Sequence, residues 1–212
     1  MIIGAMLARN EAAPDRYLRR ALCNAAQFCD RIIVVDDGST DDTAQICAQV
    51  PSCRVITRPG EGWWGQDETS ARAALWEAAA QEAGPDGWIY HFDADHELLG
   101  ISPEDFRMLT AATIVNAWCF VLYDCWDSED LHRVDGYWIA WKNPRPWLVR
   151  AMPFPNWEPQ WRQRGIHAGH HPGNYPYVTG IAFGGIRHLG YVKKEHRLRK
   201  SSKYLSLGVD NA

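Results

Sequence analysis

The feature that most constrains the fold is the order of the apolar runs in the first 97 residues. Short apolar runs typical of buried strands alternate with longer segments of helical composition. Regular succession of strand and helix predicts a parallel sheet covered by helices. The predicted strands are residues 2–7, 32–35, 54–57 and 88–92, and the predicted helices are residues 17–28, 42–49 and 70–83. Because parallel strands share one carboxyl edge, where open α/β sheets bind ligands, we expect a site at that edge.

The second half of the chain, residues 98–212, has a different character. Residues 117–161 hold seven of the eleven tryptophans among prolines and scattered charges, which predicts strands and long loops. A Gly-rich apolar strand at 180–186 and a basic helix at 193–207 follow, and residues 187–203 contain seven Lys or Arg against one acidic residue. No internal repeat or linker interrupts the 212 residues, so we expect a single α/β domain, 1–212.

Composition excludes several classes of protein. A hydrophobic share of 46% and a charged share of 23% are typical of a soluble globular chain, and a net charge of -4 argues against a nucleic-acid partner. No apolar run approaches the roughly 20 residues that cross a bilayer, so we expect no transmembrane segment and at most peripheral membrane contact. The first apolar stretch resembles a strand more than a signal peptide, and the six cysteines form no CxxC pair, which predicts reduced thiols in the cytoplasm.

The strongest local motif is IIVVDDGSTDDT, where two carboxylates follow a buried apolar strand. Gly38 makes the turn, and Ser39 with Asp42 predicts a capping box for the next helix. Asp36 and Asp37 precede that cap, so helix capping does not explain why two carboxylates stand there. A carboxylate pair repels phosphate but accepts hydrogen bonds from a base N–H or a ribose hydroxyl. The motif therefore points to the nucleoside end of a ligand.

A second acidic motif, WIYHFDADHE, follows the strand at 88–92. In an extended chain Asp93 and Asp95 point to one face, with the small Ala94 between them. Neighbouring carboxylates destabilise each other's ionised form unless a cation intervenes, and hard divalent ions such as Mn²⁺ or Mg²⁺ prefer oxygen ligands and substrate phosphates. The two motifs together predict a site for a nucleotide and a metal ion.

With these two motifs the chain resembles the family-2 glycosyltransferases, and the resemblance covers residues 2–97. It implies a GT-A fold with a mostly parallel central sheet flanked by helices, a nucleotide-binding half at 1–97 and an acceptor-side half at 98–212. It further implies that Asp37 and Asp36 bind base or ribose, that Asp95 binds the metal, and that Asp93 binds ribose or metal. The remaining donor-binding candidates are Ala8, Arg9, Asn10 and Glu11 in the ARNEA segment, Arg72 beside the acidic site, Ala94, and Lys193 in the basic tail.

The carboxy-terminal segment IRHLGYVKKEHRLRK also resembles this family, in which a histidine after a late strand supplies a further metal ligand. That residue is His188 here, and an imidazole suits Mn²⁺. Lys193, Lys194, Arg197 and Lys200 follow, either to neutralise a diphosphate or as a solvated basic face. The cluster His167, His170 and His171 lacks a recognised zinc scaffold, so zinc is not expected there.

Two further patterns need an interpretation. Gly60, Gly62 and Gly65 match the dinucleotide pattern G-x-G-x-x-G, but Trp63 and Trp64 would crowd a pyrophosphate, so we interpret the match as chance in a loop beside the donor site. Tryptophans 126, 138, 141 and 157 are predicted either as core or as an acceptor cleft, because aromatic rings stack on the flat C–H faces of sugars.

The predicted activity is transfer of a sugar from a nucleotide-diphosphate-sugar, with a UDP-sugar favoured, to a hydroxyl of a carbohydrate or glycoconjugate acceptor. Inversion at the sugar is implied by the resemblance only. A base must then deprotonate the acceptor hydroxyl, and the candidates are Glu97, which is favoured, His167 and Glu158. Two alternatives remain: a nucleotidyltransferase that makes a nucleotide sugar, and a non-catalytic carbohydrate-binding protein of the same fold.

Overall fold

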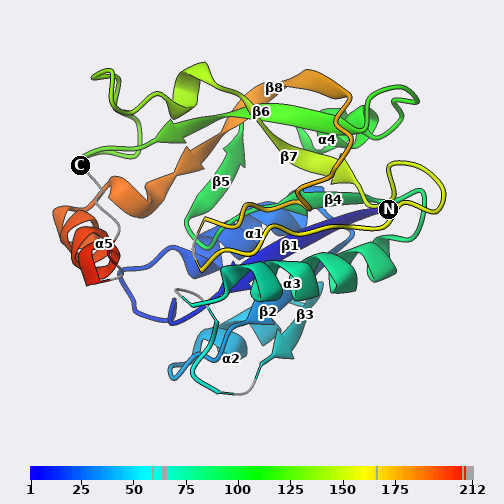
Figure 1. Ribbon diagram of the computed structural model, residues 1–212. Coiled ribbons are helices and arrows are strands. Elements are labelled where there is room, and N and C mark those ends of the chain that lie inside the picture. Colours follow the sequence, from blue (N-terminus) through cyan, green and yellow to red (C-terminus); the bar gives the residue numbers. More distant parts are fainter. Residues whose placement is uncertain (59, 64–65, 166, 207, 209–212) are drawn as a thin grey trace.

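The computed structural model describes residues 1–58, 60–63, 66–165, 167–206 and 208 (Figure 1). The strands of the described residues join in one eight-stranded sheet with the order β3-β2-β1-β4-β7-β6-β8-β5. These strands are β1 (Ile2–Ala8), β2 (Arg31–Asp36), β3 (Cys53–Thr57), β4 (Trp88–His91), β5 (His96–Leu99), β6 (Ala117–Asp124), β7 (Arg145–Arg150) and β8 (Thr179–His188). The helices are α1 (Leu18–Phe28), α2 (Thr43–Ala48), α3 (Glu68–Ala83), α4 (Pro103–Leu109) and α5 (Lys194–Ser206), with short 3-10 turns η1 (Ala140–Lys142) and η2 (Leu189–Tyr191).

The first half of the sheet is parallel, as the apolar runs predicted. Strands β3, β2, β1 and β4 pair side by side in one direction. Helix α3 covers one face, while α1, α2 and α4 cover the other, so strand β2 is buried on both faces. This double burial explains the unbroken apolar run at 32–35, because each side chain of the run contacts a helix layer.

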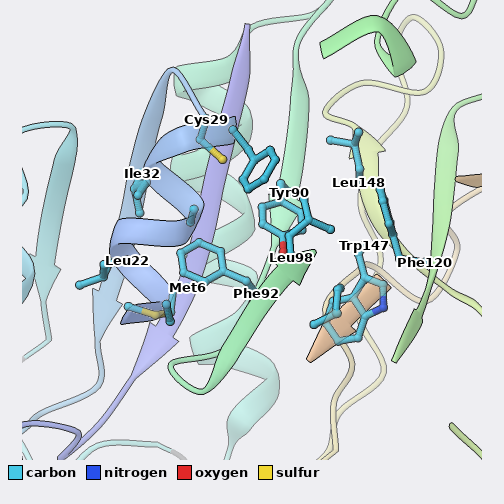
Figure 2. Packing of buried hydrophobic residues seen from close by; sticks show 14 of the residues in the cluster. Met6, Leu22, Cys29, Ile32, Tyr90, Phe92, Leu98, Phe120, Trp147 and Leu148 are labelled. Atoms are coloured by element: carbon cyan, nitrogen blue, oxygen red, sulfur yellow. The ribbon is translucent and has the colours of Figure 1, made fainter. Parts of the chain in front are cut away.

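Two apolar cores follow from this layering. One lies between the sheet and helices α1, α2 and α4, where Met6, Leu22, Ile32, Tyr90 and Phe92 come together (Figure 2). The other lies under α3 and is formed by the alternate residues of the same strands, together with aromatic residues of the loop before β8. Alternation along β1 and β2 therefore divides one set of strands between two cores.

The second half of the sheet is mixed and curls back on the first. Strand β7 runs antiparallel to β4 and to β6, β8 runs parallel to β6, and β5 closes the far edge antiparallel to β8. The curl returns β5 to α1, where the Asn24 amide exchanges two hydrogen bonds with the backbone of Leu98 (3.0 and 2.8 Å). Strands β4 and β5 are consecutive in the chain but far apart in the sheet order, and residues 92–95 connect them.

The ends of these elements define where a ligand binds. In Figure 1 the N-terminus lies at the right and α5 at the left, beyond the carboxyl end of β1. Strand β2 ends at Asp36, and β8 ends at His188 just before η2 and α5. The basic helix predicted from the sequence therefore covers the carboxyl edge. Within the part of the chain that the structure describes, no helix combines the length and the apolar character needed to span a membrane.

Candidate functional site

A cavity of about 500 Å³ lies at the carboxyl edge of the sheet, a size suited to a small ligand. Most of the residues predicted from the sequence line it: Ala8, Arg9, Glu11, Asp37, Arg72, Asp93, Ala94, Asp95, His167 and His188. Residues that the prediction did not name also line it, among them Arg16, Glu68, Arg199 and Lys203. The cavity thus brings together the ends of both acidic motifs and the basic helix α5.

Asp37 lies at one end of the cavity, under the loop that follows β3. Its carboxylate accepts hydrogen bonds from the Trp63 backbone N–H (2.8 and 3.0 Å), and its own N–H donates to Ala8 O (2.9 Å). A side chain at Gly62 would collide with the carbonyl of Asp37 and the guanidinium of Arg9, so only glycine allows this approach. This contact explains why the loop passes beside the site, as predicted; Trp64 and Gly65 lie outside the described residues.

Two of the predicted nucleoside ligands do not line the cavity. Asn10 has a φ of 55° and ties two loops together, because its Oδ1 accepts from Thr40 N (2.8 Å) and its N–H donates to Ser39 Oγ (3.0 Å). Asp36 is 1% exposed and does not line the cavity. The predicted capping box is wrong, because Asp41 accepts from Thr43 N (3.0 Å) and Ser39 serves Asn10 instead.

Glu11 stands out among the acidic residues of the cavity. Burial raises the pKa of its carboxyl from 4.5 to about 7, although Arg16 at 3.4 Å opposes this shift. The carboxyl is therefore partly protonated near neutral pH. Such a group at the edge of a cavity accepts or donates a hydrogen bond as its ligand requires.

Replacing Glu11 by glutamine is expected to stabilise the protein at high pH only. Because the folded pKa lies above the unfolded value, the wild type loses stability as pH rises from about 4.5 to about 7, and the loss is complete above that range. The variant should gain about 1 to 3 kcal/mol at pH 8 and nothing at pH 4. Urea unfolding at both pH values measures this. Equal effects at the two pH values would contradict the raised pKa.

Asp93 meets a small network on the other side of the cavity. Arg72 Nη2 lies 3.6 Å from Asp93 Oδ1, which agrees with the prediction that Arg72 approaches this acidic site. Arg72 also pairs with Glu68 (3.0 Å) and donates to His170 Nδ1 (3.1 Å). Because burial and Arg72 hold the pKa of His170 well below its ordinary value, that imidazole is neutral. Arg72 thus lies between the carboxylates of Glu68 and Asp93.

Asp95 and His188 form the centre of the site. His188 Nδ1 lies 2.7 Å from Asp124 Oδ1 at the end of β6, and this carboxylate accepts the Nδ1 hydrogen. His188 Nε2 lies 3.3 Å from Asp95 Oδ2. A carboxylate behind an imidazole fixes the tautomer in this way at many metal centres. Asp124 was missed by sequence reasoning, because only the pairing of β6 with β8 brings it beside His188.

The donor atoms of Asp95 and His188 already hold a cation of the chain itself. Lys200 Nζ lies 3.1 Å from Asp95 Oδ2 and 3.1 Å from His188 Nε2. Burial raises the pKa of Asp95, but Lys200 and His188 outweigh this effect and hold it well below its ordinary value. Gly190 leaves the space open, since a Cβ there would meet Asp95 Oδ2, Lys200 Nζ and His188 Nε2. The pocket therefore suits a positive charge, and the oxygen and nitrogen donors fit Mn²⁺ or Mg²⁺.

His96 is near this centre but presents the wrong atom for a ligand. Asp95, His96 and His188 each bring one ligand-type atom within 4.8 Å of the others. However, His96 Nδ1 accepts from Asp93 N (3.2 Å), and burial lowers its pKa to about 4. In the neutral ring Nε2 then carries the hydrogen, which faces the carboxylates of Asp93 and Asp95 (both 3.9 Å). His96 therefore lies beside these carboxylates without a hydrogen bond to them, at a position that directly follows the D-x-D motif.

Glu97 does not lie where the sequence predicted. Residues 93–95 form a turn, in which His96 N donates to Asp93 O (3.0 Å), so the chain does not stay extended. Glu97 is instead bound by Arg20 (2.9 and 3.0 Å) and Arg187 (3.1 Å) and does not line the cavity. The expectation that Glu97 faces the donor beside Asp95 is therefore wrong.

The remaining predicted residues divide between the cavity and the rest of the fold. His167 is exposed, lines the cavity and stacks on Tyr204, with ring centroids 5.6 Å apart. Lys193 Nζ donates to Asp15 O (3.1 Å) outside the cavity. Among the tryptophans, Trp157 is buried against Trp76 and Tyr175, whereas Trp126 and Trp138 line a second cavity. The core interpretation is confirmed for Trp157, and the acceptor-cleft interpretation of Trp126 and Trp138 stays a prediction.

Comparison with known proteins identifies the family. Residues 5–112, just over half of the 212-residue chain, match the model of glycosyl transferase family 2. The chain belongs to this family. The family-2 match ends before β6, so His188, Asp124 and α5 lie outside it.

Similar proteins extend this result. An uncharacterized glycosyltransferase of Rickettsia felis is 34% identical over 93 residues, which are 44% of this chain and 28% of that protein. An uncharacterized protein of Mycobacterium tuberculosis is 32% identical over 211 residues, which are 92% of this chain and 48% of that protein. This family-2 chain therefore spans less than half the length of either relative.

The fold also has a counterpart among solved structures. S. aureus TarS matches with a TM-score of 0.50 at 15% identity, over 71% of this chain and 28% of that chain. At this level of identity the likeness concerns the fold alone. It agrees with the predicted GT-A type fold, a curled and mostly parallel sheet flanked by helices.

Proposed function

We propose that this chain transfers a sugar from a nucleotide-diphosphate-sugar, with UDP favoured, to a hydroxyl of a carbohydrate or glycoconjugate acceptor. The observation that carries the proposal is the pair of Asp95 and His188, with Asp124 behind the imidazole, at the centre of the cavity. Acidic residues of both motifs and cations of α5 line the same cavity. Family membership supports the same activity.

Each part of the donor has a complementary group in the cavity. Asp37 and Glu11 are proposed to accept hydrogen bonds from base and ribose, since a carboxylate offers about four lone-pair sites and Asp37 uses some on Trp63. Arg16, Arg199 and Lys203 line the cavity as positive charges for a diphosphate. Asp93, Ala94 and Arg72 are proposed to contact the ribose and donor sugar between them.

The divalent ion is proposed to bind Asp95 and His188, with Asp93 as a further oxygen donor. When bound, Mn²⁺ or Mg²⁺ supplies positive charge that stabilises the leaving diphosphate. Transfer with inversion also needs a base at the acceptor hydroxyl. We assign this role to His167, which lines the cavity, in place of Glu97, which Arg20 and Arg187 bind.

A cytoplasmic location belongs to the same proposal. All six cysteines are free, and burial raises the pKa of Cys29, Cys47, Cys53, Cys119 and Cys125. Unpaired thiols of this kind persist in a reducing compartment.

Replacing Lys200 by methionine is expected to increase the affinity for Mn²⁺ about tenfold, because a competing ammonium worth about 1.4 kcal/mol is removed. Titration calorimetry with MnCl₂ on the protein without nucleotide measures this. Lys194→Met, on the exposed side of the same helix, is the matched control and should leave the affinity unchanged. An unchanged or weaker Mn²⁺ affinity in Lys200→Met would show that Lys200 does not share the donor atoms of the ion.

The proposed function is tested by a thermal-shift panel of UDP, GDP, CDP and dTDP, each with and without Mn²⁺. A ligand that binds only the folded state raises its melting temperature. We expect the largest shift with UDP and Mn²⁺ together and a smaller shift with either alone. No shift with any nucleotide would contradict a nucleotide-dependent enzyme and favour the carbohydrate-binding alternative. Product analysis with the matching nucleotide sugar then separates a transferase from a nucleotidyltransferase.

A further inference from the structure

A second cavity, of about 660 Å³, adjoins the first. Four residues line both cavities: His167, Tyr191, Lys200 and Tyr204. The second cavity extends from this shared wall between α5 and the loop before η1, where it is lined by Trp126, Arg133, Tyr137, Trp138, Lys194, Arg197, Leu198 and Ser201. A molecule bound there would therefore contact His167, which also lines the first cavity.

Aromatic rings form one wall of this second cavity and hold one another in place. The ring centroids of Trp126 and Trp138 lie 5.4 Å apart, and those of Trp138 and Tyr191 lie 4.5 Å apart, both edge to face. Trp126 and Tyr191 are nearly parallel at 6.2 Å. Packed rings of this kind lose little conformational entropy when a ligand binds, and their faces suit the C–H face of a sugar ring.

Cations surround these rings. Arg133 and Arg197 lie over the Trp126 ring at 4.3 and 4.4 Å, and Lys200 lies 4.3 Å from the centre of the Tyr191 ring. Lys194 adds a fourth positive charge, whereas no Asp or Glu is among the described residues that line this cavity. The described lining of this cavity therefore carries positively charged groups only, which favours an anionic ligand over a neutral one.

The acids that pair with these cations leave room for an anion. Arg133 pairs with Asp135, and Arg197 pairs with Asp127 (2.7 Å), whose side chain is 68% exposed. Arg197 is itself 17% exposed and also donates to the carbonyls of Tyr191 and Val192 (2.6 and 3.0 Å), so an incoming anion would replace only the solvent-screened acid. Lys194 forms no ion pair with any residue that the structure describes. The second cavity therefore retains a positive charge.

We propose that the second cavity binds the acceptor, and that the acceptor is a sugar carrying a phosphate or a carboxylate. The inference rests on the proposed function, because the shared wall gives an acceptor hydroxyl access to His167 and the donor cavity. The aromatic wall binds the sugar ring, and Arg133, Lys194 and Arg197 bind the anionic group. Phosphate and carboxylate share this recognition chemistry, since both accept hydrogen bonds from guanidinium and ammonium groups.

Three sugars of matched size test this inference: glucose, glucose 6-phosphate and glucuronic acid. Each is titrated into protein saturated with UDP and Mn²⁺, which occupy the first cavity, and binding is followed by tryptophan fluorescence. We expect at least one of the anionic sugars to bind ten or more times more tightly than glucose, with a difference that shrinks at 1 M NaCl. A preference for one anionic sugar identifies phosphate or carboxylate as the group. Equal affinities for all three sugars would overturn the inference.

Three variants test whether the sugars bind in the second cavity. Lys194→Glu should remove most of the preference for anionic sugars, whereas Trp138→Ala should weaken all three sugars. Lys142→Glu, an exposed charge reversal beside Trp141 and outside the cavity, is the control and should change neither. If Lys194→Glu retains the full preference, the anion binds elsewhere and the inference is wrong. The shift in melting temperature with UDP and Mn²⁺ is recorded for the wild type and for every variant. If the wild type shows no such shift, the proposed function is refuted independently of the result with the sugars.

Discussion

Asp95→Asn is expected to remove the metal-dependent part of UDP binding while the protein stays folded. The substitution keeps the size of the side chain but deletes the negative charge that Lys200 and His188 both face at 3.1 and 3.3 Å. We expect the affinity for UDP in the presence of Mn²⁺ to fall about 100-fold, which is about 2.7 kcal/mol. The affinity for UDP without metal should change little. Titration calorimetry with and without 1 mM MnCl₂ separates these two components.

Asp130→Asn is the matched control for this substitution. Its side chain is 91% exposed and lies 3.9 Å from Arg187, so the same change of charge is made away from the cavity. It should leave both affinities as in the wild type. Folding of Asp95→Asn is checked by circular dichroism. If the folded variant retains Mn²⁺-dependent UDP binding, Asp95 is no ligand of the ion.

Gly190→Ala is expected to weaken Mn²⁺-dependent UDP binding by a similar factor, because the added methyl group takes up the space proposed for the ion. The new methyl group would meet Asp95 Oδ2 and Lys200 Nζ and would lie 3.0 Å from His188 Nε2. It would therefore fill the position between the donor atoms. Because Gly190 does not have a left-handed backbone, alanine adds no backbone strain, and the fold should be retained. We expect Mn²⁺-dependent binding of UDP to fall at least 100-fold by the same calorimetric assay.

Gly173→Ala provides the comparison. A Cβ at this position lies 3.2 Å from the flexible side chain of Arg162, which can move, and Gly173 does not line the cavity. The control should bind UDP and Mn²⁺ normally. Normal Mn²⁺-dependent binding by Gly190→Ala would mean that the ion does not lie between Asp95 and His188.

Much of the first half of the fold could be predicted because its signals are local. The apolar run at 32–35 is unbroken because both faces of β2 are covered, and the carboxylates follow where the strand ends. Residues at strand ends share one edge in a parallel sheet, so Asp37 and Asp95 could be expected in one site. The sequence also predicted the basic helix α5 and the approach of Arg72 to Asp93.

The errors concern features that depend on contacts distant in the sequence. Strand β5 has four residues and pairs with β8 across about ninety positions, which no local pattern indicates. A turn at 93–95 and the pairing with Arg187 therefore turn Glu97 away from the donor, although an extended chain would have aligned it with Asp95. Asp124 was missed for the same reason, because only the parallel pairing of β6 and β8 brings it to His188.

Because the sheet curls, the two ends of the cavity are completed at different times while the chain is synthesised. The end of the cavity at Asp37 is built by residues up to Trp63, which emerge from the ribosome early, whereas Asp124, His188, Gly190 and Lys200 come from the second half of the chain. A nascent chain that ends after β5 would have its parallel sheet, Asp37 and the carboxylates of Asp93 and Asp95, but not His188, which is also proposed to hold the ion. Affinity for Mn²⁺ would therefore serve as a reporter that β8 has paired and α5 has closed over the edge.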